Sequence, residues 1–75
     1  MTHRERMLKG YHGLLDGLAR RDSLVDRLEM TIDKNREYLS DEKIQAGLDS
    51  CAKSRAQIAQ DRARVQEKAK EFGLI

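Results

Sequence analysis

The sequence from residue 7 to residue 39 reads MLKGYHGLLDGLARRDSLVDRLEMTIDKNREYL. Apolar side chains recur in this stretch at alternating intervals of four and three residues. The series consists of Met7, Tyr11, Leu14, Leu18, Arg21, Val25, Leu28, Ile32, Asn35 and Leu39. Such spacing places side chains on one face of an α-helix. Because the spacing continues without a shift through residues 20–23, it predicts one helix over residues 4–39.

A second series with the same spacing follows. It consists of Ile44, Leu48, Cys51, Arg55, Ile58, Arg62, Val65, Ala69 and Phe72. Ser40, Asp41 and Glu42 come before it, and their side-chain oxygens can accept hydrogen bonds from the free N–H groups at a helix start. Gly73 follows the series, as is typical of a helix end. The sequence therefore predicts a turn near residue 40 and a second helix over residues 41–72.

Two long helices joined by a short turn lie antiparallel. We therefore predict an all-α fold, a coiled-coil-like antiparallel helical hairpin that forms a single domain over residues 1–75. The expected contacts pair Ile32 with Leu48, Leu14 with Val65, and Met7 with Phe72. The alternative is a three-helix bundle in which residues 20–22 form a turn and Ser23 caps a separate helix.

A two-helix hairpin of 75 residues buries little apolar surface. We therefore expect it to dimerise into a four-helix bundle or to pack against another protein. Charged residues make up 37% of the chain, the net charge is +2, and proline is absent. Basic and acidic residues are mixed in both halves of the sequence, whereas nucleic-acid binding proteins usually have a concentrated basic face. We expect a protein partner and not a nucleic acid.

The residues of catalytic and metal sites are sparse. His3 and His12 lie nine positions apart with no cysteine or carboxylate at metal-ligand spacing. Cys51 is the single cysteine, has no histidine near it in sequence, and falls within the second series, where it would act as a small hydrophobic residue. We expect no enzyme activity, no cofactor and no metal. The lone thiol and the absence of a long apolar segment predict a cytoplasmic protein with no membrane contact.

The candidate partner-binding surface lies in the N-terminal third of the chain. Three glycines fall on one stripe of the first helix and would let a partner helix approach closely, although a weakly helical arm is the alternative. Leu8 and Leu15 widen the apolar series into a band, which we expect to contact a partner or a second copy. The residues of this surface are Met7, Leu8, Gly10, Tyr11, Gly13, Leu15 and Gly17.

Three arginines interrupt the two apolar series: Arg21, Arg55 and Arg62. A guanidinium in such a position needs a carboxylate or must reach water, and Asp22, Asp26 and Asp61 are near enough to serve. The arginines either extend past the small alanines around them or set the register of pairing. The neighbouring acidic stripe needs basic groups opposite it or contact with solvent. Its residues are Asp22, Asp26, Glu29, Asp33 and Glu37.

One segment resembles a known family. Residues 28–44 read LEMTIDKNREYLSDEKI and are similar to the corresponding segment of the Hha/YmoA family, small enterobacterial modulators that bind a nucleoid protein. The matching residues are Leu28, Glu29, Ile32, Lys34, Asn35, Leu39, Ser40 and Asp41. The segment covers less than a quarter of the chain, and the tryptophan of the family's C-terminus is missing. The hairpin plan also looks like the small co-chaperones of type III secretion needle subunits.

These observations lead to one functional hypothesis and three alternatives. The hypothesis is a non-catalytic regulator or inhibitor, of the kind that phages and other mobile elements encode, that binds a larger protein through an apolar helix face. The alternatives are an assembly factor or secretion-type chaperone that shields a partner helix, an Hha-like modulator of a nucleoid protein, and an RNA-binding four-helix bundle. The last would use Arg55, Arg62, Arg64, Lys68 and Lys70.

Overall fold

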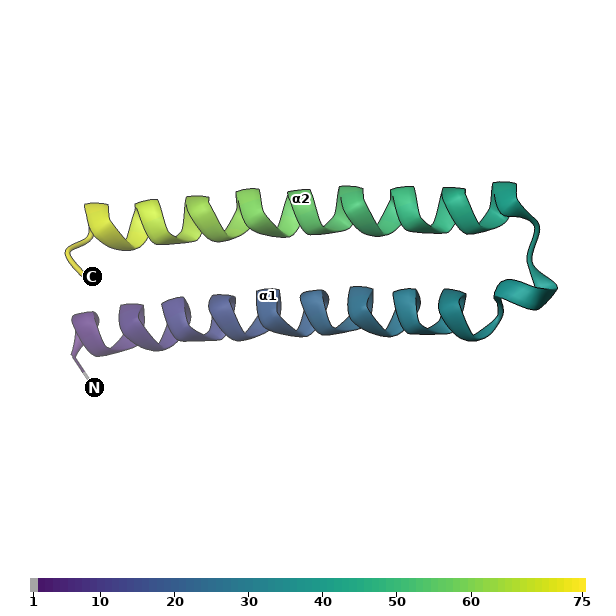
Figure 1. Ribbon diagram of the computed structural model, residues 1–75. Coiled ribbons are helices and arrows are strands. Elements are labelled where there is room, and N and C mark those ends of the chain that lie inside the picture. Colours follow the sequence, from purple (N-terminus) through teal and green to yellow (C-terminus); the bar gives the residue numbers. More distant parts are fainter. Residues whose placement is uncertain (1) are drawn as a thin grey trace.

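A computed structural model describes residues 2–75 as two long helices joined by a short turn (Figure 1). Helix α1 spans His3–Lys34, the 3-10 helix η1 spans Arg36–Tyr38, and helix α2 spans Asp41–Glu71. The helices run antiparallel, so the two chain ends lie at the same end of a body that measures 55 × 19 × 11 Å. The predicted all-helical hairpin is confirmed.

Helix α1 is continuous through its middle. It begins after Thr2, whose hydroxyl accepts a hydrogen bond from the N–H of Glu5 at 3.2 Å. It then passes through residues 20–23 without a break. The proposed turn at this point is wrong, and the three-helix alternative falls with it. The physical reason is that the apolar rows on both sides of this segment keep one phase, so one straight helix can bury them all.

Helix α1 ends five residues earlier than the spacing predicted. The backbone N–H of Asn35 donates to the carbonyls of Thr31 and Ile32, and its side-chain amide donates to the Thr31 carbonyl at 2.7 Å. The chain then forms η1 and becomes extended at Leu39 (φ −109°, ψ 142°). Packed helices lie about 8–10 Å apart, so the chain needs several residues to cross between them. The apolar spacing continues through these residues and therefore does not reveal the helix end.

The caps of α2 follow the sequence signals. The hydroxyl of Ser40 accepts a hydrogen bond from the N–H of Lys43 at 3.2 Å. At the other end, Gly73 adopts φ +69°, a left-handed conformation that glycine adopts without strain. The N–H of Leu74 then donates to the carbonyl of Ala69 at 2.8 Å.

The core runs along the line of contact between the two helices. Its buried residues are Leu18, Val25 and Ile32 from α1 and Cys51, Ile58 and Ala69 from α2. Leu15, Ile44, Leu48 and Val65 pack against this cluster. The predicted series of α2 is confirmed as its contact face, except that Phe72 at its end is 60% exposed.

The contact face of α1 differs from the prediction by one residue. Leu14 and Leu28 were expected in the contact but are 58% and 46% exposed. The residues that follow them, Leu15 and Glu29, are half-buried instead. In a helix of 3.6 residues per turn, positions i+3 and i+4 lie on opposite sides of residue i. The row of Leu14, Arg21 and Leu28 therefore faces one broad side of the hairpin, and the row of Leu15, Asp22 and Glu29 lies on the other side of the buried row.

Charge explains this shift. With the predicted face, Arg21 would point into the contact towards Arg55 and Arg62, and three like charges would repel one another there. A small turn of α1 about its axis, which keeps Leu18, Val25 and Ile32 buried, replaces Arg21 with Asp22, which is paired with Arg55. Burial of charge is tolerated when opposite charges meet, so the turned arrangement is favoured.

Gly47 allows the helices to approach closely near the turn. A Cβ atom at this position would lie 2.7 Å from Cδ1 of Ile32, which is closer than van der Waals contact permits. The expected pairing of Ile32 with this part of α2 is therefore confirmed, with Gly47 beside the predicted Leu48.

The hairpin exposes more surface than a compact protein of its size. Its radius of gyration is 17.0 Å, against about 11 Å for a globular chain of this length. Its accessible surface is 5922 Å², roughly 1,200 Å² more than the ~4,700 Å² usual for a mass of 8.6 kDa. Among the described residues, neither helix has an apolar stretch that could cross a membrane.

Candidate protein-binding face

An arginine of α2 occupies the centre of one broad side of the hairpin. The Nη2 atom of Arg55 lies 2.8 Å from Oδ1 of Asp26 and 3.0 Å from Oε1 of Glu29, and its Nη1 atom lies 3.3 Å from Oδ1 of Asp22. The hydrogen bonds to Asp26 and then to Glu29 raise the pKa of Arg55 above its ordinary value. Arg55 thus neutralises part of the acidic stripe, which the sequence had left open to a partner or to solvent.

A second ion pair joins the helices on the opposite broad side. Nη1 of Arg21 donates to Oδ2 of Asp61 at 2.8 Å, and the side-chain amide of Gln57 donates to the other oxygen at 2.9 Å. The hydrogen bond from Arg21, followed by that from Gln57, lowers the pKa of Asp61 below its ordinary value. The predicted carboxylate partners Asp22, Asp26 and Asp61 are thereby confirmed. Arg62 is half-buried and forms no ion pair within the described part of the chain.

Replacing Asp61 by asparagine is expected to destabilise the hairpin in a pH-dependent way. Because the folded-state pKa of Asp61 is lowered, its contribution is present above the unfolded-state pKa, about 3.9, and is lost as the pH falls through the folded-state value. Urea unfolding of the wild type and Asp61→Asn should differ at pH 7 and converge in acid. The exposed Asp16 supplies the control, because Asp16→Asn removes no interhelix pair. A difference that stays constant down to about pH 2 would contradict the ion pair.

Large apolar side chains are exposed along the side that carries Arg21. We call this row the apolar strip: it consists of the exposed residues Leu14, Leu24, Leu28 and Phe72 and the half-buried Met7. Met7, Leu14 and Leu28 share one row of α1 because they are separated by multiples of seven, and Leu24 lies one turn before Leu28. Leu24 is 60% exposed. Exposed large apolar side chains that gather on one side of a small protein are typical of an interaction surface.

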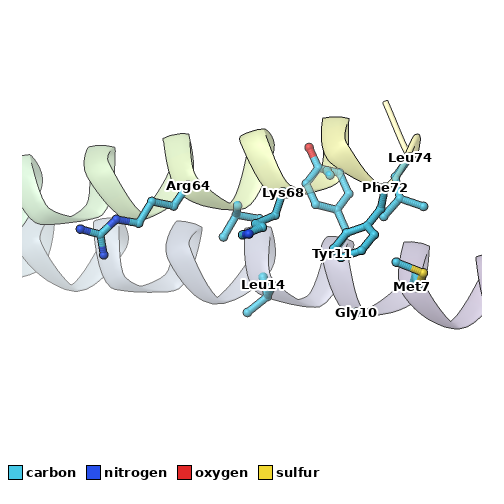
Figure 2. A pocket seen from close by; sticks show the side chains of 10 residues that line it. Met7, Gly10, Tyr11, Leu14, Arg64, Lys68, Phe72 and Leu74 are labelled. Carbon is cyan, nitrogen blue, oxygen red and sulfur yellow. The ribbon is translucent and has the colours of Figure 1, made fainter.

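The strip deepens into a groove at the open end of the hairpin (Figure 2). The groove has a volume of about 360 Å³, and its walls are almost entirely apolar. Its lining residues are Met7, Gly10, Tyr11, Leu14, Arg64, Val65, Lys68, Ala69, Phe72 and Leu74. Leu14 and Val65, and Met7 and Phe72, which were expected to be neighbours, line this same groove. Arg64 and Lys68 supply the groove's positive charges.

The N-terminal candidate residues fall into two groups. Met7, Gly10 and Tyr11 line the groove. Leu15 packs against the core, so its assignment to a free apolar band is wrong, because the turn of α1 about its axis brings it inside. Leu8 belongs to the same row as Leu15 and is half-buried.

The three glycines of α1 face open space. A Cβ atom at Gly10, Gly13 or Gly17 would meet nothing within 4 Å outside the helix itself. Their helix is nevertheless continuous, so the weakly helical arm is not observed. Of the three, Gly10 alone lines the groove, where its missing side chain leaves the groove wide.

Acidic residues gather near the turn of the folded hairpin and basic residues near its open end, although the two kinds are mixed along the linear sequence. The turn half, residues 22–57, carries six basic and eight acidic side chains. The open half, residues 1–21 and 58–75, carries nine basic and five acidic ones. The two halves thus have net charges of −2 and +4. Because both chain ends are basic and the hairpin brings them together, mixed signs in the sequence become a charge gradient along the molecule.

Comparisons with protein-family models, curated proteins and solved structures find no match for this chain. Within residues 2–75, no three potential metal ligands lie together.

Proposed function

We propose that this protein is a non-catalytic binding protein of the cytoplasm that regulates or inhibits a larger protein by packing against one of its helices. The apolar strip supports this proposal most directly. Leu14, Leu24 and Leu28 expose about half or more of their surface. Leaving such side chains in water has no stabilising role, and burial of the remaining half by a partner contributes about 1 kcal/mol or more each.

The groove favours an amphipathic helix as the partner's contact element. An apolar groove between two helices accepts side chains spaced along one helix face. Arg64 and Lys68 lie beside it, so a helix with acidic residues next to its apolar face would be preferred. An assembly factor that shields a partner helix would use the same surface in the same way.

Self-association into a four-helix bundle is part of this proposal. The hairpin's excess exposed surface, roughly 1,200 Å², exceeds the ~800 Å² that each partner buries in a standard interface. A second hairpin would therefore be able to cover the strip.

Capture from a lysate of the source organism tests partner binding. The bait is the immobilised chain, compared with a variant carrying Leu14→Glu and Leu28→Glu. These substitutions remove apolar contact at two exposed positions, so captured protein should fall by about 100-fold or more. Met30→Glu is the matched control, because Met30 is 57% exposed and lies outside the strip.

Two results would count against the proposal. If the strip variant and the Met30→Glu variant retain the same proteins equally, the strip is not the binding surface. If nuclease treatment of the lysate removes the captured material, the basic open half binds nucleic acid, and the RNA-binding alternative replaces the protein partner.

A further inference from the structure

Two leucines of the apolar strip are placed symmetrically about Arg21. Leu14 and Leu28 lie seven residues before and after Arg21, and all three belong to one row of α1. If a second α1 packs against this row in the opposite direction, with Arg21 at the twofold axis, Leu14 of each copy meets Leu28 of the other. In a parallel arrangement, each leucine would meet its own counterpart.

The charge gradient distinguishes these two arrangements. In the antiparallel arrangement, the open half of each copy, with net charge +4, lies beside the turn half of the other, with net charge −2. In the parallel arrangement, the two open halves lie together and repel each other along their whole length. Opposite charges across an interface fix its orientation more than they determine its affinity.

The centre of the strip also suits a twofold axis. Arg21 contacts Asp61 through Nη1 alone, and a guanidinium has five N–H donors, so others remain for a second carboxylate. Two Arg21–Asp61 pairs that meet at the axis form a neutral group of four charges. Arg21 can therefore lie within an apolar interface without an excess of like charge.

From these observations we infer that the resting occupant of the apolar strip is a second copy of this chain, bound antiparallel. The inference rests on the proposed function, because it uses the same strip, and it adds a means of regulation. The Leu24–Leu28 end of each copy's strip covers the groove of the other. The partner helix and the second copy then compete for one surface, so the concentration of the chain controls how much of it can bind the partner.

Sedimentation of the purified chain at micromolar concentration tests the association. The wild type and Met30→Glu should be dimers, and Leu14→Glu with Leu28→Glu should raise the dimer Kd by at least about 100-fold. A wild-type chain that stays monomeric up to about 100 μM would overturn the inference, since its Kd would then be weaker than that of ordinary specific dimers. The capture experiment tests the proposed partner binding separately, and its result does not depend on whether the chain dimerises.

Disulfide trapping tests the orientation and does not depend on how well the glutamate variant folds. One protein carries Leu14→Cys and another carries Leu28→Cys, and they are oxidised separately and as a mixture. The antiparallel arrangement predicts a heterodimer in the mixture and little cross-linking of either protein alone, because cysteines must approach to a Cα distance of about 7 Å or less. The wild type is the control, because Cys51 is only 1% exposed. Cross-linking of each protein with itself would show the parallel arrangement and overturn the inference, while self-association would stand.

Discussion

Ser23→Pro is expected to unfold the hairpin. Ser23 lies near the middle of the continuous helix α1, where proline removes a backbone hydrogen bond, clashes with the preceding turn and costs about 3 kcal/mol or more. A single small core of this kind rarely provides more than about 3–5 kcal/mol of stability in total. Circular dichroism during urea unfolding should therefore show either a chain that is unfolded without denaturant or a midpoint shifted to very low urea.

Asp41→Pro provides the matched control for this prediction. Asp41 is the first residue of α2, where the N–H has no partner within the helix and the φ angle of proline is already helical. Ser40 before it is extended, with ψ at 157°, as a residue preceding proline requires. This variant should lose less than about 1 kcal/mol. If Ser23→Pro were equally mild, α1 would not be one helix, and the three-helix bundle would be the correct fold.

Ile58→Ala is expected to have the next largest effect. Ile58 is 3% exposed and belongs to the central cluster of the interhelix contact. Truncating a buried isoleucine to alanine costs about 2–5 kcal/mol, because transfer free energy is lost and a cavity remains. The free energy of unfolding from urea titration should fall by this amount, which leaves little or no folded hairpin.

Met30→Ala is the control for the core truncation. It also removes a large apolar side chain from a helix, but Met30 is 57% exposed in the hairpin. Its free energy of unfolding should stay within about 0.5 kcal/mol of the wild type. If the two variants lost equal stability, Ile58 would not lie in the core.

The sequence predicted α2 better than α1, and the difference has a physical cause. In α2, each position of the apolar series has alanine, glycine or polar residues on both sides, so there was one possible contact face. In α1, Leu14 and Leu15 are adjacent, and two faces one residue apart both look apolar. The choice between them depends on Arg55 meeting Asp22 and Glu29 across the hairpin. That contact joins residues far apart in the chain, so it cannot be predicted from the periodicity of α1 alone.

Two other features of the hairpin were not predicted from the sequence, for related reasons. Asn35 ends α1 through hydrogen bonds to Thr31, although it occupies an apolar-series position. The charge gradient arises because the hairpin places the two basic chain ends, residues 1–21 and 58–75, side by side although they are far apart in the sequence. Counting the charges at each level of the predicted hairpin, and not along the linear chain, would have revealed it.

Each contact between the two helices closes a loop of chain, and this loop is longer the farther the contact lies from the turn. This gradation determines when Cys51 becomes exposed during unfolding. The contact of Ile32 with Gly47 closes a short loop beside the turn, whereas the groove that Met7 and Phe72 both line lies between the two ends of the chain. Short loops close first and at lower entropic cost. The contacts between the helices therefore form from the turn outwards and are lost first at the free end. Cys51 is the single cysteine and lies in the core of the early-closing part. Its thiol becomes accessible to a labelling reagent only when the two helices have separated along almost their whole length. The rate of thiol labelling therefore reports global unfolding and is not affected by fraying of the free end.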